Sequence, residues 1–260
     1  MQRSAALITV VLLFGVGAVG CAPVGSNTGS SATVTDSATW LTASQRAAGW
    51  KPLFDGSTLT GWRGYKSQTV PAGWRVVDGT LTKDGPIGDL ITANQYGDFE
   101  LAFDWMITPG GNAGVFYRGT EEYDHIYWSA PEYQLLDDAA HADGRNRLTS
   151  TGAAYGLYPA PAGAVKPAGQ WNSTLITVQG NRVQHWLNGQ KLLEYDIASA
   201  DWLGKVKASK FNDYPNYGRA ARGHIGFQGD HEGTLTLRNV RIREIRTAYT
   251  GGSDAAGGAK

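Results

Sequence analysis

The feature that most constrains the fold is a succession of short runs of alternating or β-branched residues, each closed by a turn signal. In one pair, Arg182–Leu187 is separated from Lys191–Tyr195 by Asn188-Gly189. Both central residues of a type I′ turn adopt positive φ, so Asn-Gly predicts a β-hairpin. Eight further runs read as strands: Trp74–Val77, Leu81–Lys83, Asp98–Ile107, Gly114–Arg118, Glu132–Leu136, Ser173–Gln179, His224–Gln228 and Thr234–Glu244. Since no long stretch keeps a helical period, we expect an all-β, two-sheet antiparallel β-sandwich of jelly-roll type.

The N-terminus has the layout of a secretory signal. Arg3 precedes an apolar run, Ala5–Val19, which is followed by Gly20 and Cys21. The run is too short and too rich in small residues for a comfortable membrane span. We therefore predict that residues 1–20 are a signal peptide and that the protein is exported.

Cys21 is the only cysteine, so the mature chain can form no internal disulfide. Its place after Ala18, Val19 and Gly20 resembles a bacterial lipobox, which predicts a lipid anchor at Cys21 and a position on the cell surface or in the periplasm. The alternative is an incidental cysteine beside an ordinary cleavage site, because Ala18 stands where the lipobox pattern prefers Leu.

The regions on either side of the strand-like runs are poor in large apolar side chains. Such segments cannot bury enough surface to offset the entropy lost on ordering. We therefore expect residues 21–45 to form a lipidated N-terminus and flexible tether, and residues 247–260 to form a disordered tail. The folded domain is expected over residues 49–246, a length that one β-sandwich can fill.

The charge balance excludes one class of partner and the aromatic content suggests another. Lys plus Arg and Asp plus Glu are 23 each, so the net charge is zero and no basic field exists to hold a nucleic acid. The chain also has 9 Trp and 12 Tyr, whose flat rings suit the C–H faces of sugars. Carbohydrate is therefore the expected ligand.

Polar side chains recur on one face of three predicted strands. Because side chains alternate along a strand, the shared faces carry Asn112 with Arg118, Glu132 with Gln134, and His224 with Gln228. If these faces line one sheet, they form a groove able to hold sugar hydroxyls. The alternative is that each polar face is the solvated side of an antiparallel sheet.

Eight segments occur in the order typical of one family. They are LFDGSTLTGW (53–62), GNAGVFYR (111–118), EYQLLD (132–137), Tyr155-Gly156, WNSTLITVQGNRVQHWLNG (171–189), SKFNDYPNYG (209–218), RGHIGFQ (222–228) and RNVRIREI (238–245). Together they resemble the signature segments of the 3-keto-disaccharide hydrolase domain. The resemblance implies a concanavalin A-like jelly roll and action on glycosides already oxidised to a ketone at C3.

The chemistry that the resemblance implies needs three groups. A C3 ketone acidifies the C2 proton, so a base can remove it, an enediolate can form, and the C1 glycosidic oxygen can leave by β-elimination before water adds back. We predict proton transfer by Glu132 and His231, with Arg118 as the electrostatic donor to the enediolate oxygen. The expected substrate-binding residues are Asn112, Gln134, His224, Gln228 and Tyr155. A sugar oxidase acting earlier would supply the ketone.

Two other functions remain open at this stage. A non-catalytic carbohydrate-binding lipoprotein of the same fold would keep the aromatic residues without needing the catalytic group. A retaining glycosidase would need two carboxylates about 5 Å apart, and Gln134 in place of a second acidic residue beside Glu132 counts against it. A divalent metal ion could polarise the ketone, with His125, Glu132 or Asp137 as ligands, although no spacing forms a metal motif.

Overall fold

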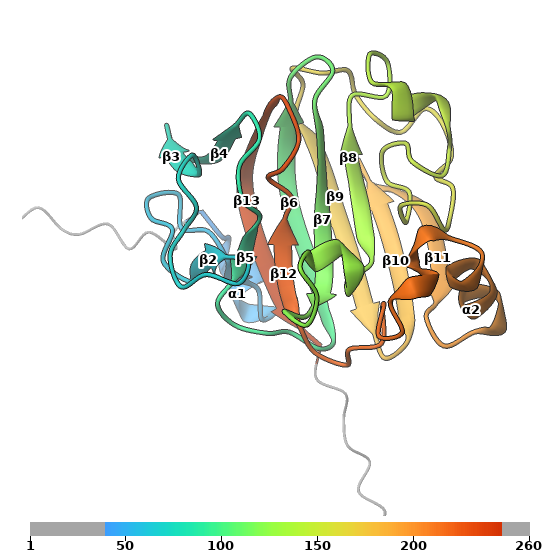
Figure 1. Ribbon diagram of the computed structural model, residues 1–260. Helices are drawn as coiled ribbons and strands as arrows, with labels where there is room; N and C mark the ends of the chain where they lie inside the picture. The colour runs from blue at the N-terminus through green and yellow to red at the C-terminus, as the bar shows by residue number, and fades with distance from the viewer. Residues whose placement is uncertain (1–39, 246–260) are drawn as a thin grey trace, which may run out of the picture. The chain divides into compact units, whose positions relative to one another are not determined.

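The computed structural model describes residues 40–245, which form two antiparallel β-sheets packed face to face (Figure 1). The eight-stranded sheet has the order β11-β10-β9-β6-β13-β4-β3, with β1 paired to β13. Its strands are β1 (Lys51–Pro52), β3 (Arg75–Val77), β4 (Thr80–Asp84), β6 (Phe99–Ile107), β9 (Asn172–Gln179), β10 (Arg182–Leu187), β11 (Gln190–Asp196) and β13 (Thr234–Glu244). The predicted all-β, two-sheet antiparallel sandwich is confirmed.

The second sheet has five strands in the order β2-β5-β12-β7-β8. They are β2 (Trp62–Gly64), β5 (Leu90–Thr92), β12 (His224–Phe227), β7 (Asn112–Gly119) and β8 (Glu132–Leu136). The helices are α1 (Ala43–Ala47), α2 (Ala200–Lys207) and three 3₁₀ turns, η1 (Ile126–Trp128), η2 (Ala142–Arg145) and η3 (Lys210–Asp213).

The core lies between the sheets and follows the predicted alternation. Along β6, Phe99, Leu101, Phe103 and Trp105 are all buried. They share one apolar cluster with inward residues of the facing sheet, such as Val115. Burial of these side chains is the main stabilising contribution, at roughly 1.5–3 kcal/mol for each large apolar group.

The predicted hairpin is present between β10 and β11. Asn188 and Gly189 have φ of 50° and 82°, as a type I′ turn requires, and Leu187 pairs with Gln190 across it. Helix α2 was not predicted, because it is short and only Trp202 is buried on it. It begins where the Ser199 side chain accepts a hydrogen bond from the Trp202 main chain.

The N-terminal boundary of the fold differs from the prediction. Residues 40–45 were expected in the flexible tether, whereas Leu41 is 1% exposed and Thr42 caps helix α1 with a capping box. The buried Leu41 side chain ties this part of the chain to the domain, so the tether prediction is wrong for these residues.

Several predictions fall outside the described residues. The signal peptide 1–20, the lipidation site Cys21 and the tail 247–260 lie in the parts of the chain that are not described. Export and the lipid anchor therefore stay predictions. Within residues 40–245, no helix is long and apolar enough to cross a membrane.

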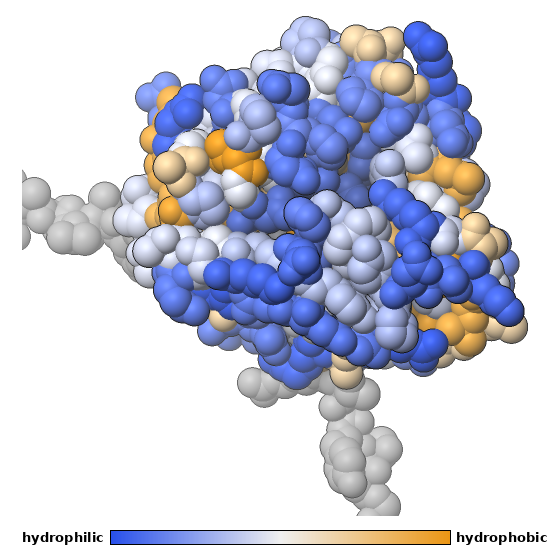
Figure 2. All heavy atoms as spheres, in the orientation of Figure 1, coloured by the Kyte–Doolittle hydropathy of each residue, from blue (hydrophilic) through white to orange (hydrophobic). Residues whose placement is uncertain are grey.

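The outer face of the five-stranded sheet is partly covered by residues 120–131, which include η1. A second apolar cluster forms beneath this cover, made by Ile91, Phe116, Ile126 and Ala130. The rest of this side of the molecule shows mainly hydrophilic residues (Figure 2). The cover therefore divides the sheet face, and a pocket lies on one side of it.

Candidate functional site

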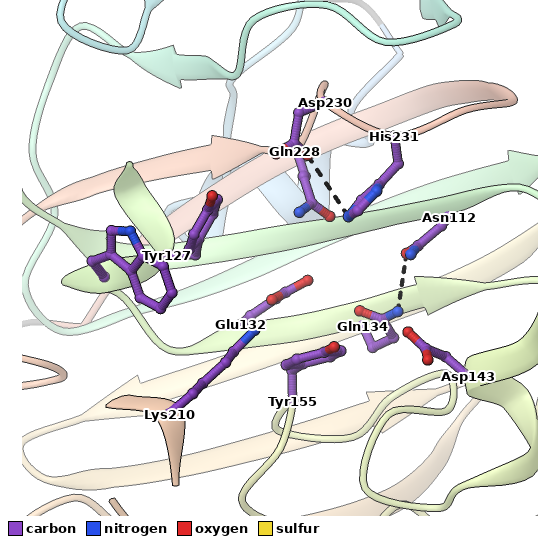
Figure 3. A pocket seen from close by; sticks show the side chains of 11 residues that line it. Asn112, Tyr127, Glu132, Gln134, Asp143, Tyr155, Lys210, Gln228, Asp230 and His231 are labelled. Atoms are coloured by element: carbon purple, nitrogen blue, oxygen red, sulfur yellow. Dashed lines mark hydrogen bonds and ion pairs between the residues drawn. The ribbon is translucent and has the colours of Figure 1, made fainter. Parts of the chain in front are cut away.

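The pocket on the outer face of the five-stranded sheet has a volume of about 230 Å³. Pockets for drug-sized ligands are typically about 300–1,000 Å³, so this one suits a single small ring. Its lining comes from strands β7 and β8 and from loops (Figure 3). The lining residues are Asn112, Tyr127, Trp128, Glu132, Gln134, Asp143, Tyr155, Lys210, Gln228, Asp230 and His231.

Six of the eight predicted catalytic and binding residues line this pocket: Asn112, Glu132, Gln134, Tyr155, Gln228 and His231. Strand register explains the convergence, because Gly114 of β7 pairs with Gln134 and its carbonyl accepts from the Gln228 main chain. Gly114 also makes room for the carboxyl, since a Cβ there would lie 2.1 Å from Glu132 Oε1. Asn112, Glu132, Gln134 and Gln228 of the polar faces therefore line one pocket.

The amide side chains leave two acceptors facing the pocket. Gln134 Nε2 donates to Asn112 Oδ1 at 3.0 Å. The Oε1 atoms of Gln134 and Gln228 are buried and have no hydrogen-bond partner among the described residues. An unpaired buried acceptor costs free energy, so both oxygens are suited to ligand hydroxyl donors.

Glu132 is 7% exposed, and its carboxyl accepts no hydrogen bond from any described residue. Burial raises its pKa to about 8, a shift that the positive charge of Lys210 opposes and the negative charges of Asp230, Asp89 and Asp143 increase. At neutral pH the carboxyl is therefore mainly protonated and can donate a proton.

His231 lies in the turn after β12, across the pocket from Glu132 (Figure 3). Its Nε2 is 3.7 Å from Asp230 Oδ1. Partial burial lowers the pKa of His231, and the neighbouring Asp230 carboxylate partly offsets this. The imidazole is therefore neutral at pH 7 and can accept a proton. Burial moves the pKa values of Glu132 and His231 in opposite directions, which is typical of an acid and base pair.

Lys210 is one of three charged pocket residues that the sequence analysis did not predict. Its Nζ lies 4.6 Å from the centre of the Tyr155 ring and 5.8 Å from that of Trp128. Buried Phe211 stacks on Tyr217 with ring centres 4.1 Å apart, which anchors η3. Burial in turn raises the pKa of Tyr155 to about 12, so this phenol stays neutral.

Asp143 and Asp230 were also missed. Asp143 lies in the short 3₁₀ turn η2 and Asp230 in the loop after β12, and neither segment has a period long enough to predict the direction of a side chain. Lys210 does fall within SKFNDYPNYG, one of the segments that carry the family resemblance. The presence of residues 209–218 among the family segments could therefore have indicated that this loop contributes to the site.

The predicted role of Arg118 as electrostatic donor is wrong, because its side chain points away from the pocket. Nη2 of Arg118 pairs with Asp98 at 2.8 Å, and its other nitrogens donate to the carbonyls of Gly97 and Gly180. Arg118 has φ of 54°, at an irregularity in the pairing of β7 with β12. This bulge breaks the alternation on which the prediction depended, and Arg118 instead links the two sheets.

His224 does not reach the pocket either, so its predicted binding role is wrong. It shares the outer face with Gln228, but the second apolar cluster separates them. The Nε2 atom of His224 is 3.4 Å from Arg63 Nη2, and Arg63 forms a bidentate pair with Glu121. This polar cluster holds the covering segment 120–131 against the sheet.

The comparisons with known proteins agree with this geometry. The family model described as the 3-keto-alpha-glucoside-1,2-lyase-like domain matches residues 49–243. The chain belongs to this family. The predicted family resemblance is therefore confirmed, and the match includes every element that lines the pocket.

This lyase-like domain is similar to one protein in sequence and to another in both sequence and structure. The chain is 34% identical over 231 residues to the 3-keto-disaccharide hydrolase of Bacteroides thetaiotaomicron, covering 76% of this chain and 79% of that protein. A crystal structure of a candidate glycosyl hydrolase from Parabacteroides distasonis has 32% identity and a TM-score of 0.75, covering 79% of this chain and 98% of that one.

A second Parabacteroides distasonis structure, also of a candidate glycosyl hydrolase, has 27% identity and a TM-score of 0.59. It covers 75% of this chain and 99% of the other. The fold of this lyase-like domain is thus also similar to that of the second structure.

The candidate metal ligands of this lyase-like domain are His125, Glu132 and Asp137. His125 stacks on Tyr127 outside the pocket lining, and Asp137 accepts a hydrogen bond from the Gly110 main chain at 2.8 Å. Residues 40–245 contain no group of three or more His, Cys, Asp or Glu side chains suited to one ion. These three residues do not form a ligand set.

Proposed function

We propose that this protein cleaves the glycosidic bond of 3-keto-glycosides by C2 proton abstraction, β-elimination at C1 and rehydration. The observation that carries the proposal is the pocket itself, in which a buried carboxyl, an imidazole and an ammonium group surround a space suited to one sugar ring. Family membership and the name of the Bacteroides relative support the same substrate class.

The donors and acceptors of the pocket would orient the substrate. A ketone oxygen only accepts hydrogen bonds, so it belongs near the Lys210 ammonium rather than near the free Oε1 atoms of Gln134 and Gln228. Those acceptors suit the remaining sugar hydroxyls. The Tyr155 and Trp128 rings offer apolar surface to the sugar C–H groups.

In the proposed reaction, His231 accepts the C2 proton and the electron pair of the C–H bond forms the enediolate. The Lys210 ammonium stabilises the negative oxygen. Glu132 then donates its proton to the glycosidic oxygen as the C1–O bond breaks, which releases the leaving group as an alcohol. This leaves a C1–C2 double bond conjugated with the C3 ketone.

Rehydration reverses the proton transfers. The Glu132 carboxylate takes a proton from water, whose oxygen adds to C1, and the His231 imidazolium returns its proton to C2. The products are a 3-keto monosaccharide and the leaving-group alcohol, and both side chains recover their starting states. The substrate must first be oxidised at its C3 hydroxyl, so the proposal implies a sugar oxidase acting earlier.

The test is turnover of a 3-keto-disaccharide by the full chain in D₂O, with the unoxidised disaccharide as the control and a chelator in a parallel sample. We expect monosaccharide from the keto substrate only, with one deuterium at C2 of the released keto sugar, because the proton held by the His231 imidazolium exchanges with D₂O before C2 is reprotonated. Release without deuterium would indicate direct hydrolysis. Binding without release would instead favour the carbohydrate-binding lipoprotein.

A pair of substitutions distinguishes the electrostatic donor from the residue first predicted in that role. Lys210→Met should lower kcat by about 10²–10³-fold, the loss typical of one oxyanion donor. Arg118→Met should leave the kcat of the folded protein unchanged but lower the free energy of unfolding by about 1.5–3 kcal/mol, because it breaks a partly buried, charge-assisted hydrogen bond to Asp98. Turnover assays and thermal melts measure both, and the opposite pattern would return the role to Arg118.

A further inference from the structure

Lys83 is a fully buried lysine that the proposed reaction does not use. It lies on β4 of the eight-stranded sheet and is 0% exposed. Burying an ammonium group costs free energy, which a carboxylate partner commonly offsets. The described residues place no carboxylate within ion-pair distance of Lys83. Its partners are instead three main-chain carbonyls.

Two of those carbonyls belong to the turn that carries the proposed base. Lys83 Nζ donates to His231 O at 2.5 Å, lies 3.5 Å from Gly229 O, and reaches Gly85 O at 3.4 Å on its own side. The Lys83 side chain therefore reaches from the eight-stranded sheet to the loop that leaves β12 of the five-stranded sheet. It binds the main chain of His231 itself.

The same turn is fixed at Gly229 by two further contacts. The Gly229 amide donates to Asp89 Oδ1 at 2.8 Å, and its carbonyl accepts from the Ile87 amide at 2.8 Å. A Cβ on Gly229 would lie 2.5 Å from Gly88 O, so only glycine fits at this position without a shift of the main chain. Beyond Gly229, Lys83 Nζ contacts the turn at the His231 carbonyl, and the Asn112 amide donates to the Glu232 carbonyl that follows.

We propose that Lys83 is a positioning residue, which holds the 229–231 turn so that His231 faces the pocket. This inference rests on the proposed function for its effect on turnover, but its effect on His231 itself can be measured separately. The charge of Lys83 also helps to lower the pKa of His231, together with His141, while Asp230 and Asp143 act in the opposite direction.

The decisive variant is Lys83→Met, which keeps an unbranched side chain only one atom shorter and removes the charge. Because Met cannot donate a hydrogen bond, the substitution leaves the His231 carbonyl without this donor, and we expect the variant to fold with a lower melting temperature. Turnover of the 3-keto-disaccharide should fall by about 100-fold, the effect of a small displacement of a reacting group. Lys191→Met is the matched control, because Lys191 is exposed on β11 and pairs with Glu194.

An NMR titration of the His231 ring gives a readout independent of activity. In Lys83→Met the pKa of His231 should rise, because a neighbouring positive charge is gone, while Lys191→Met should leave it unchanged. If the wild type shows no turnover, the proposed function fails and the titration still tests Lys83. A folded Lys83→Met variant with full turnover and an unchanged His231 titration would overturn the inference. Should that variant not fold, Lys83→Gln retains one donor and is measured in the same way.

Discussion

Replacing Glu132 with Gln is expected to lower kcat for a 3-keto-disaccharide by about 10²–10⁴-fold, the usual contribution of a general acid. The amide fills the same space beside Gly114 but cannot give a proton to the departing oxygen. Glu122→Gln is the matched control, since Glu122 is exposed and bonds Asn216 outside the pocket. A Glu132→Gln variant with wild-type turnover would remove this residue from the mechanism.

The same substitution has a separate signature in stability. The folded pKa of Glu132 is about 8, against an ordinary value of 4.5. Between these values the unfolded chain has released the proton that the folded protein retains, so the free energy of unfolding falls as pH rises from about 4.5 through 8. This loss is on the order of 5 kcal/mol in total. Glu132→Gln should remove it, and denaturant unfolding at pH 5 and pH 8 measures the difference.

The second large effect is expected for His231→Gln, which should also lower kcat/KM by about 10²–10⁴-fold. In the wild type the active form needs a neutral His231 and a protonated Glu132, so the pH profile of kcat/KM should be bell-shaped. Its acid limb lies below the ordinary histidine pKa of 6.5, and its alkaline limb lies near pH 8.

In His231→Gln the acid limb should disappear and the alkaline limb remain, because only Glu132 still titrates. His125→Gln serves as the control, since His125 is exposed and stacks on Tyr127 without lining the pocket. An acid limb that persists in His231→Gln would assign the base to another group.

The regular parts of the site could be predicted from sequence because a strand has a fixed period. Gln134 follows Glu132 by two positions on β8 and must share its face. In the sheet, β7 lies beside β8, and β12 lies on the other side of β7. Loop residues have no such period. Lys210, Asp143 and Asp230 reach the pocket through turns whose direction depends on packing elsewhere, such as the stacking of Phe211 on Tyr217.

The two wrong site residues have distinct physical causes. Arg118 lies at a bulge, which reverses the face on which a strand residue lies. Its positive φ cannot be predicted from the sequence, because arginine has no preference for that conformation. His224 is on the predicted face, but the covering segment 120–131 folds across that face and isolates it. Alternation predicts which side of a sheet a residue occupies and does not predict what else lies on that side.

That covering segment also limits what the proposed enzyme can accept. An open sheet face would let a long polysaccharide lie across it, with units bound on both sides of the cleaved bond. Here Ile126 and Ala130 pack onto Phe116 and Ile91 and block the face at one end of the pocket. On the proposal made above, only the terminal unit of a sugar chain can enter, so the enzyme would act from chain ends, and a polymer oxidised solely at internal units would stay intact in the turnover assay.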